Sequence, residues 1–251
     1  MTQPYYSDDR VTLYHGDCRE ITEWLAADVL VTDPPYGMNH SKHGDNRPAI
    51  TGESRTGRAS DRVLTDDDVR VRNDALALWL PRPAMVFGNW RAPKPTGTRM
   101  RMIWDKGVIG MGGVGAWRSA DEEIYIVGNW PNPRDEGGDQ KSVIQSAALR
   151  GDRPDHPTPK PVGLMEYLLS HTPPGVVADP FAGSGATLLA ARNLGRKIIG
   201  VELEERYCEL IASRLDQGVL DFGEGSAEFV RCSCAPGLCY AECTTASEAV
   251  R

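Results

Sequence analysis

The stretch that decides the fold is Gly175–Glu202, GVVADPFAGSGATLLAARNLGRKIIGVE. It begins with an apolar run that ends at Asp179, continues through a turn of small residues at 182–185 and a helical pattern, and closes with a second apolar run. A strand, a tight turn, a helix and a second strand make one βαβ unit, and such units build doubly wound sheets. The sequence therefore predicts an α/β fold with a mostly parallel sheet.

The turn in this stretch predicts an adenosine pocket. Glycines at 183 and 185 let the backbone approach a ligand closely, and Glu202, 23 residues after Asp179, is placed to hold both hydroxyls of a ribose. Leu188 stands where a dinucleotide fingerprint has its third glycine, which disfavours a dinucleotide. An acid ahead of the turn suits a ligand with a cationic centre better than it suits a pyrophosphate.

A second informative stretch is Thr32-Asp33-Pro34-Pro35-Tyr36-Gly37, which follows the apolar run 29–31. The two prolines stiffen the turn and remove two N–H groups, so that carbonyls here are left to accept hydrogen bonds. Acceptors beside an aromatic face suit a planar ring that carries an amino group. Taken alone, the stretch is equally well explained as a strand-ending turn with a capping aspartate.

Composition bounds the class of protein. The chain of 251 residues is 40% hydrophobic and 25% charged, which is ordinary for a globular protein with one large α/β domain or two small ones. No apolar run approaches the length of a membrane span, and the N-terminus is polar and acidic, so we expect a cytoplasmic protein without membrane contact. Of the net charge of −7, −6 falls between Glu202 and Arg251, which leaves room for a basic DNA-binding face elsewhere.

Four of the six cysteines fall in the C-terminal tail at Cys232, Cys234, Cys239 and Cys243. Their spacing could surround a zinc ion, but it lacks the paired C-x2-C knuckles of typical zinc sites. The alternative is a reduced tail without metal. We therefore predict no metal, with the four cysteines as the weaker alternative.

Together, the two motifs resemble those of the amino-methylating DNA methyltransferases, which use S-adenosylmethionine and act on adenine N6 or cytosine N4. Asp33-Pro-Pro-Tyr36 precedes Asp179-Pro-Phe-Ala-Gly183-Ser-Gly185, which is similar to the circularly permuted order called the β class. The resemblance covers nearly all of 11–215, since further segments lie where the family has its other motifs: 15–17, 86–90, 101–106, 122–127 and 156–161.

The resemblance implies a doubly wound, mostly parallel, seven-stranded sheet of the S-adenosylmethionine-dependent methyltransferase type, permuted so that the catalytic half precedes the cofactor half. Seven strand candidates are found, near 11–14, 28–32, 84–87, 99–104, 122–127, 175–179 and 197–201. We expect one methyltransferase domain at 1–220, with a catalytic half (11–128), a short target-recognition or loop region (129–155) and a cofactor half (156–220). Residues 221–251 would form an acidic, poorly ordered tail.

The resemblance also implies the site residues. The catalytic turn would be Asp33, Pro34, Pro35 and Tyr36. The cofactor would be bound by Asp17, Thr158, Lys160, Asp179, Phe181, Ala182, Gly183, Ser184, Gly185 and Glu202. Within this set, Asp17 would lie near the adenine, Glu202 at the ribose, and Thr158 and Lys160 over the methionine carboxylate.

The expected reaction is methylation of the N6 amino group of an adenine that is flipped out of duplex DNA. Asp33 and the Pro34 carbonyl would each accept one N–H, which turns the nitrogen lone pair toward the methyl group, while Tyr36 stacks on the base. Cytosine N4 is the nearest alternative, although the family's cytosine members more often have serine at the position of Asp33. A homodimer and a restriction–modification partner are both compatible with the family.

Three further readings are weaker. RNA or protein-glutamine methylation would favour asparagine in place of Asp33. A non-catalytic DNA- or nucleotide-binding relative would not be expected to keep Asp33, Tyr36, Asp179 and Glu202 together. A nicotinamide dehydrogenase is disfavoured by Leu188.

Overall fold

The structure is a computed structural model that describes residues 2–35, 69–107, 113–114, 116–131, 141–145 and 160–217. All of these fall in one compact unit, Met1–Gln217. The strands are β1 (Tyr6–Ser7), β2 (Val11–His15), β3 (Val29–Thr32), β4 (Ala84–Gly88), β5 (Thr98–Asp105), β6 (Gly113–Val114), β7 (Trp117–Arg118), β8 (Asp121–Val127), β9 (Val143–Gln145), β10 (Val177–Asp179) and β11 (Ile198–Glu202). The helices are the 3-10 helix η1 (Glu23–Ala26) and the α-helices α1 (Arg70–Trp79), α2 (Val162–Ser170), α3 (Ala186–Asn193) and α4 (Glu205–Gln217).

The described strands form one mixed sheet in the order β1-β2-β11-β10-β3-β4-β8-β5-β9, with β6 and β7 as a separate hairpin. The five neighbours from β2 to β4 are parallel, whereas β8 runs antiparallel to both β4 and β5. From β3 the chain moves outward to β4, and from β10 it moves outward to β11 on the other side. The boundary between β10 and β3 is therefore the switch point at which doubly wound sheets bind ligands.

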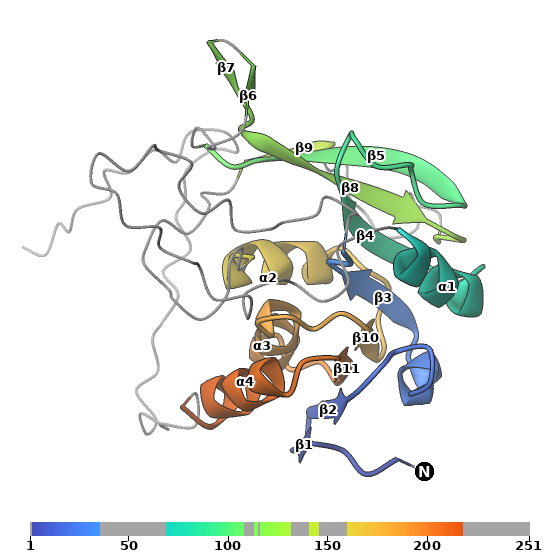
Figure 1. Ribbon diagram of the computed structural model, residues 1–251, viewed down its shortest axis with the longest axis vertical. Coiled ribbons are helices and arrows are strands. Elements are labelled where there is room, and N and C mark those ends of the chain that lie inside the picture. Colours follow the sequence, from blue (N-terminus) through green and yellow to red (C-terminus); the bar gives the residue numbers. More distant parts are fainter. Residues whose placement is uncertain are drawn as a thin grey trace, which may run out of the picture. The chain divides into compact units, whose positions relative to one another are not determined.

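Helices cover both faces of the sheet (Figure 1): α2, α3 and α4 lie on one face, and α1 and η1 on the other. The first three residues of the central strand β3 are apolar because both of its faces are covered: Val29 and Val31 pack with the first group of helices, and Leu30 packs with the second. On the second face the rings of Trp24 and Trp79 stack with their centroids 5.8 Å apart. The hydrophobic clusters on the two faces hold the strands, and with them the strand ends, in place.

Each of the seven predicted strands is present in this sheet, and the helix predicted between the last two of them is α3. Within the described residues the sheet also contains β1 and β9, so it has two strands more than the predicted count. β9 lies in the region 129–155, which was predicted as a short target-recognition or loop region, and it pairs in parallel with β5. Both additional strands are only two or three residues long, too short to show a periodic pattern.

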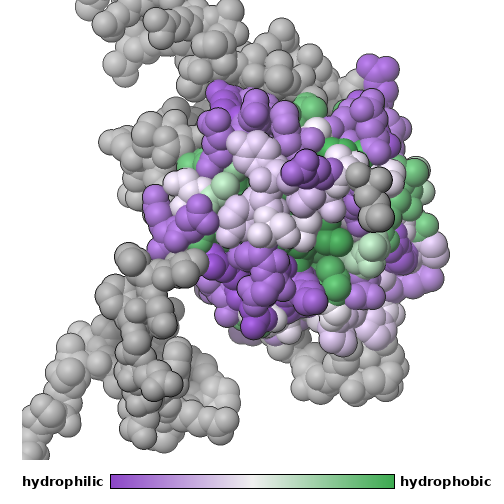
Figure 2. All heavy atoms as spheres, turned by 90° about the horizontal axis from the view of Figure 1, so that it is seen from below, coloured by the Kyte–Doolittle hydropathy of each residue, from purple (hydrophilic) through white to green (hydrophobic). Residues whose placement is uncertain are grey.

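The surface of the described part is polar, with scattered apolar side chains. On the face drawn in Figure 2, hydrophilic residues predominate and the hydrophobic ones form small separate patches. Among the helices of the described residues, none has the length and apolar character needed to cross a membrane.

Candidate active site

The carboxyl ends of β3 and β10 bring the two sequence motifs together. The strands are parallel neighbours, with Leu30 beside Ala178, so Asp33 and Asp179 leave the sheet at the same edge. The Thr32 hydroxyl links the two ends by donating a 2.6 Å hydrogen bond to Asp179 Oδ1, across 147 residues of sequence. The site therefore lies at the switch point of the sheet.

Asp179 is a buried carboxylate, with 1% of its surface exposed. Burial raises its pKa to about 6, although hydrogen bonds from Thr187, Thr32 and the Phe181 N–H oppose the shift. The carboxylate of Asp33 adds to the rise by repulsion. A positive charge placed beside Asp179 would therefore be stabilised strongly, because little solvent screens it.

The turn between β10 and α3 consists mostly of small residues that are buried. Gly185, at the start of α3, has φ of +81°, and a Cβ there would lie 2.8 Å from Ile211 Cγ1. A larger residue would be both strained and in steric conflict, which explains why glycine stands at this position. Ala182 and Ser184 are buried within the turn. We call this turn, residues 181–185, the cradle.

Glu202, the last residue of β11, closes the other side of this cradle. Its Oε2 accepts a 2.7 Å hydrogen bond from the Gly183 N–H, and its Oε1 accepts a 2.9 Å bond from the Glu204 N–H. Burial nevertheless raises the pKa of Glu202 to about 7, since only 8% of the residue is exposed. Each carboxylate oxygen has a further lone pair, so the fixed carboxylate can also accept from two hydroxyls of a ligand.

A cluster of alternating charges, Asp33–Lys160–Glu122–Lys106, occupies the same edge of the sheet. The buried Lys160 ammonium lies 2.5 Å from Asp33 Oδ2 and 3.1 Å from Glu122 Oε2. Glu122 Oε1 lies 2.5 Å from the ammonium of Lys106. Burial lowers the pKa of Lys160, but the charges of Asp33 and Glu122 outweigh it and raise that pKa overall. Burial raises the pKa of Glu122, whereas the charges of Lys160 and Lys106 together lower it.

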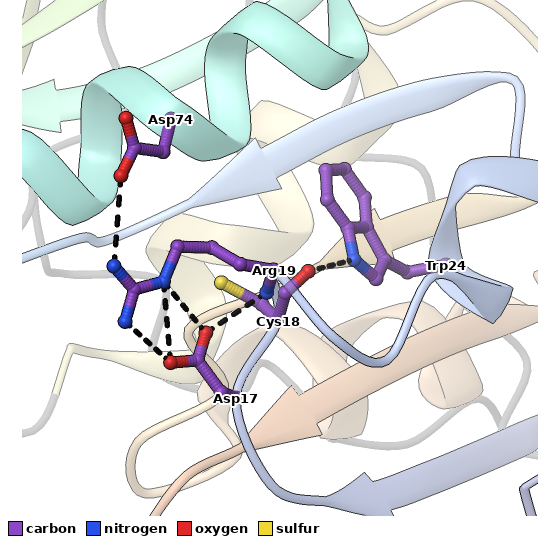
Figure 3. A network of polar contacts seen from close by, with 5 residues as sticks. All are labelled: Asp17, Cys18, Arg19, Trp24 and Asp74. Carbon is purple, nitrogen blue, oxygen red and sulfur yellow. Dashed lines mark hydrogen bonds and ion pairs between the residues drawn. The ribbon is translucent and has the colours of Figure 1, made fainter.

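Asp17, after β2, is held by a neighbouring arginine, as Figure 3 shows. The Arg19 guanidinium contacts both carboxylate oxygens of Asp17, with Nη2 2.6 Å from Oδ2, and reaches Asp74 of α1 at 3.6 Å. Hydrogen bonds from the Arg19 side chain hold the pKa of Asp17 below its usual value. The Trp24 indole fixes the same loop by donating to the Cys18 carbonyl over 2.9 Å. Asp17 is thus pre-oriented and ionised.

The structure brings together most of the predicted site residues that it describes. Asp33, Lys160, Asp179, Gly183, Gly185 and Glu202 surround one edge of the sheet. Tyr36, Thr158 and the four tail cysteines lie outside the described residues. Within the described ranges, no group of three or more His, Cys, Asp or Glu could hold a metal ion.

Sequence reasoning missed Thr32, Thr187, Glu122 and Lys106 as site residues. The sequence contained one signal for Glu122 and Lys106. Lys106 follows the strand candidate 99–104, and the oppositely charged Glu122 begins the next candidate, 122–127. Which face of the sheet they occupy depends on the strand register.

Comparisons with known proteins agree with this geometry. A family model described as DNA methylase, of the N6/N4 type, matches residues 58–213. The type II methyltransferase M.ScaI of Streptomyces caespitosus is 27% identical over 86% of this chain and 84% of its own length. M2.LlaDCHI of Lactococcus lactis subsp. cremoris is 23% identical over 87% of this chain and 94% of its own length.

Solved structures share the fold. The complex of M1.HpyAVI with SAM aligns with a TM-score of 0.53 and 23% identity over 81% of this chain and 99% of its own. The cytosine-N4-specific PvuII DNA methyltransferase aligns with a TM-score of 0.53 and 15% identity over 85% of this chain and 89% of its own.

Proposed function

The chain belongs to the N6/N4 family of DNA methylases, and on that basis we propose that it methylates the N6 amino group of adenine in double-stranded DNA. The resemblance seen in the sequence is thereby confirmed at the level of the family. S-adenosylmethionine is the methyl donor. The permuted order of the two halves stays a prediction, although Asp33 does precede Asp179 in the chain.

The cradle fits the predicted cofactor. The backbone from Phe181 to Gly185 would lie along its methionine portion, and the fixed carboxylate of Glu202 would accept from the ribose hydroxyls. Asp179, buried at the base of the cradle, favours the cationic sulfonium. Asp17 would accept from the adenine amino group. When bound, the cofactor supplies a methyl group that its sulfonium activates for direct transfer.

The predicted contact of Lys160 with the methionine carboxylate is a further part of this proposal. In the structure its ammonium lies between Asp33 and Glu122. Thr158, which would act beside it, lies outside the described residues. The other predicted cradle residues, Ala182 and Ser184, are buried and would act through the shape of the turn.

Asp33 is the residue that would act on the target base. Its side chain is 26% exposed, so an amino group can reach it, and its Oδ2 is fixed by Lys160. A carboxylate accepts several hydrogen bonds, so pairing with Lys160 is compatible with accepting an N–H of the amine. The Pro34 carbonyl would accept the second N–H, and both bonds strengthen as positive charge develops on the nitrogen. Reaching this turn requires the base to leave the duplex.

The observation that carries this proposal is the meeting of Asp33 and Asp179 at the switch point, joined through Thr32. It places an acceptor for an amino group beside a buried carboxylate suited to a cation. Adenine is preferred to cytosine because the turn has aspartate and not serine at position 33. Since the family includes both activities, N4 methylation of cytosine is the alternative.

The test is expression of the full chain in a host that lacks adenine methylation, followed by mass spectrometry of the nucleosides from its DNA. We expect N6-methyladenine from the wild type and none from Asp33→Ala. Asp9→Ala, at an aspartate that is 81% exposed, is the matched control and should retain activity. N4-methylcytosine alone would overturn the base assignment, and equal methylation by wild type and Asp33→Ala would overturn the mechanism.

Other parts of the prediction follow from the same experiment and two additions. Sequencing that detects modified bases gives the target, and sedimentation of the purified chain tests the homodimer. A zinc assay on the intact chain and on one truncated after Leu220 tests the cysteine tail.

A further inference from the structure

We propose that Glu122 is a positioning residue for methyl transfer, which shares the Lys160 ammonium with Asp33 and so sets how firmly that ammonium holds the accepting carboxylate. The inference rests on the proposed function, because it takes Asp33 as the acceptor. It adds Glu122 on β8, and its partner Lys106 after β5, to the residues that act with Asp33 in the turn after β3.

Glu122 is held by the sheet itself. It lies opposite Trp104 in the antiparallel ladder of β5 and β8, and its side chain is 15% exposed. The Lys160 ammonium, which it faces, is 7% exposed and lies 5.0 Å from the centroid of the Phe87 ring. Few waters screen charges among such neighbours, so removing one charge is felt by the others.

The distances show unequal sharing of one ammonium between two carboxylates. Lys160 Nζ is 2.5 Å from Asp33 and 3.1 Å from Glu122, while Glu122 is itself 2.5 Å from Lys106. If Glu122 loses its charge, it no longer competes with Asp33 for the Lys160 ammonium, and Asp33 becomes a weaker acceptor. If Lys106 loses its charge, Glu122 attracts Lys160 more strongly, and Asp33 becomes a better acceptor that is more easily protonated.

The direct electrostatic effects have the same signs. Among the described residues, the charged groups near Asp33 come from four elements: Lys160 before α2, Glu122 on β8, Lys106 after β5 and Asp179 on β10. Removing the negative charge of Glu122 lowers the pKa of Asp33, and removing the positive charge of Lys106 raises it. A titrating group outside this cluster would not shift in opposite directions in the two variants.

The experiment measures single-turnover methylation from pH 5 to 9, with enzyme in excess over DNA from a host that lacks adenine methylation and with saturating radiolabelled S-adenosylmethionine. We expect Glu122→Gln to lower the plateau rate about tenfold and to move the acid limb of the profile down by about half a pH unit. Lys106→Met should move the acid limb up by a similar amount. Asp121→Asn removes a charge from an exposed position one residue away and should leave the profile unchanged.

The outcomes separate this inference from the function it rests on. No methylation by the wild type would overturn the proposed function. An active wild type whose acid limb moves in neither variant, or moves in the same direction in both, would overturn the role of Glu122. Thermal melting checks that the variants fold. If Glu122→Gln does not fold, Lys106→Met serves as the test alone, because the Lys106 side chain is 24% exposed and its replacement should be tolerated. An upward shift of the acid limb then supports the role of Glu122. No shift, or a downward shift, overturns it.

Discussion

The charge on Glu202 has a consequence for stability that can be measured without any ligand. Burial raises the pKa of this carboxyl to about 7 in the folded chain, from 4.5 for the ordinary group. Between these values the folded state keeps a proton that the unfolded state has released, so stability falls as pH rises. Above about pH 7 both states are ionised and the loss is complete. The shift corresponds to about 3 kcal/mol, at most about 1.4 kcal/mol per pH unit.

Glu202→Gln removes this titration. The amide can still accept one of the two backbone N–H bonds, but its NH2 group faces the other donor, which costs about 1–3 kcal/mol at every pH. The absolute stability of the variant is therefore less informative than its pH dependence. We expect the free energy of unfolding of the variant, minus that of the wild type, to rise by about 3 kcal/mol between pH 4.5 and pH 7.5.

The assay is urea denaturation of both proteins at constant ionic strength across this range. Glu209→Gln, on the exposed surface of α4, is the matched control, and its difference from the wild type should stay flat. A difference for Glu202→Gln that is equally flat would refute the argument that burial governs this carboxylate.

Three other predictions follow from the same site. Cofactor affinity, measured by calorimetry on the wild type, should fall as pH drops below about 7, where Glu202 becomes protonated. Glu202→Gln should bind the cofactor weakly, and its affinity should change little with pH. If the variant keeps the steep pH dependence of the wild type, another group causes it. Thr32→Val should lower the free energy of unfolding by about 1–3 kcal/mol in urea denaturation, because the buried Asp179 loses its 2.6 Å hydrogen bond; an unchanged midpoint would show that the bond adds nothing. Gly185→Ala should lower the free energy of unfolding by more than about 1 kcal/mol, because of the positive φ and the contact with Ile211. Gly163→Ala in α2, where a Cβ meets nothing within 4 Å, should raise it by about 0.5–1 kcal/mol. Equal effects of the two substitutions in thermal melts would contradict the steric argument.

The sequence was sufficient wherever the signal is local. The run 175–202 contains a strand, a glycine turn, a helix and a second strand in succession, and each of these forms at or near its predicted position. The helix α2, Val162–Ser170, was likewise predictable from its apolar pattern and the proline before it. The short strands β1 and β9 were not, since a strand of two or three residues is stabilised by the neighbouring strand it pairs with and not by its own composition.

By itself, the sequence determined the family, and it predicted a stiff acidic turn and an adenosine pocket. Only the tertiary structure decided which charges meet. The cofactor contact of Lys160 stays a prediction from its motif, and the structure adds that its ammonium lies between Asp33, after β3, and Glu122, on β8. The physical reason is that a buried ammonium must be paired, and it forms ion pairs with the carboxylates that the sheet places within reach. Which carboxylates lie within reach depends on strand order and register. These are determined by contacts between residues that are distant in the sequence.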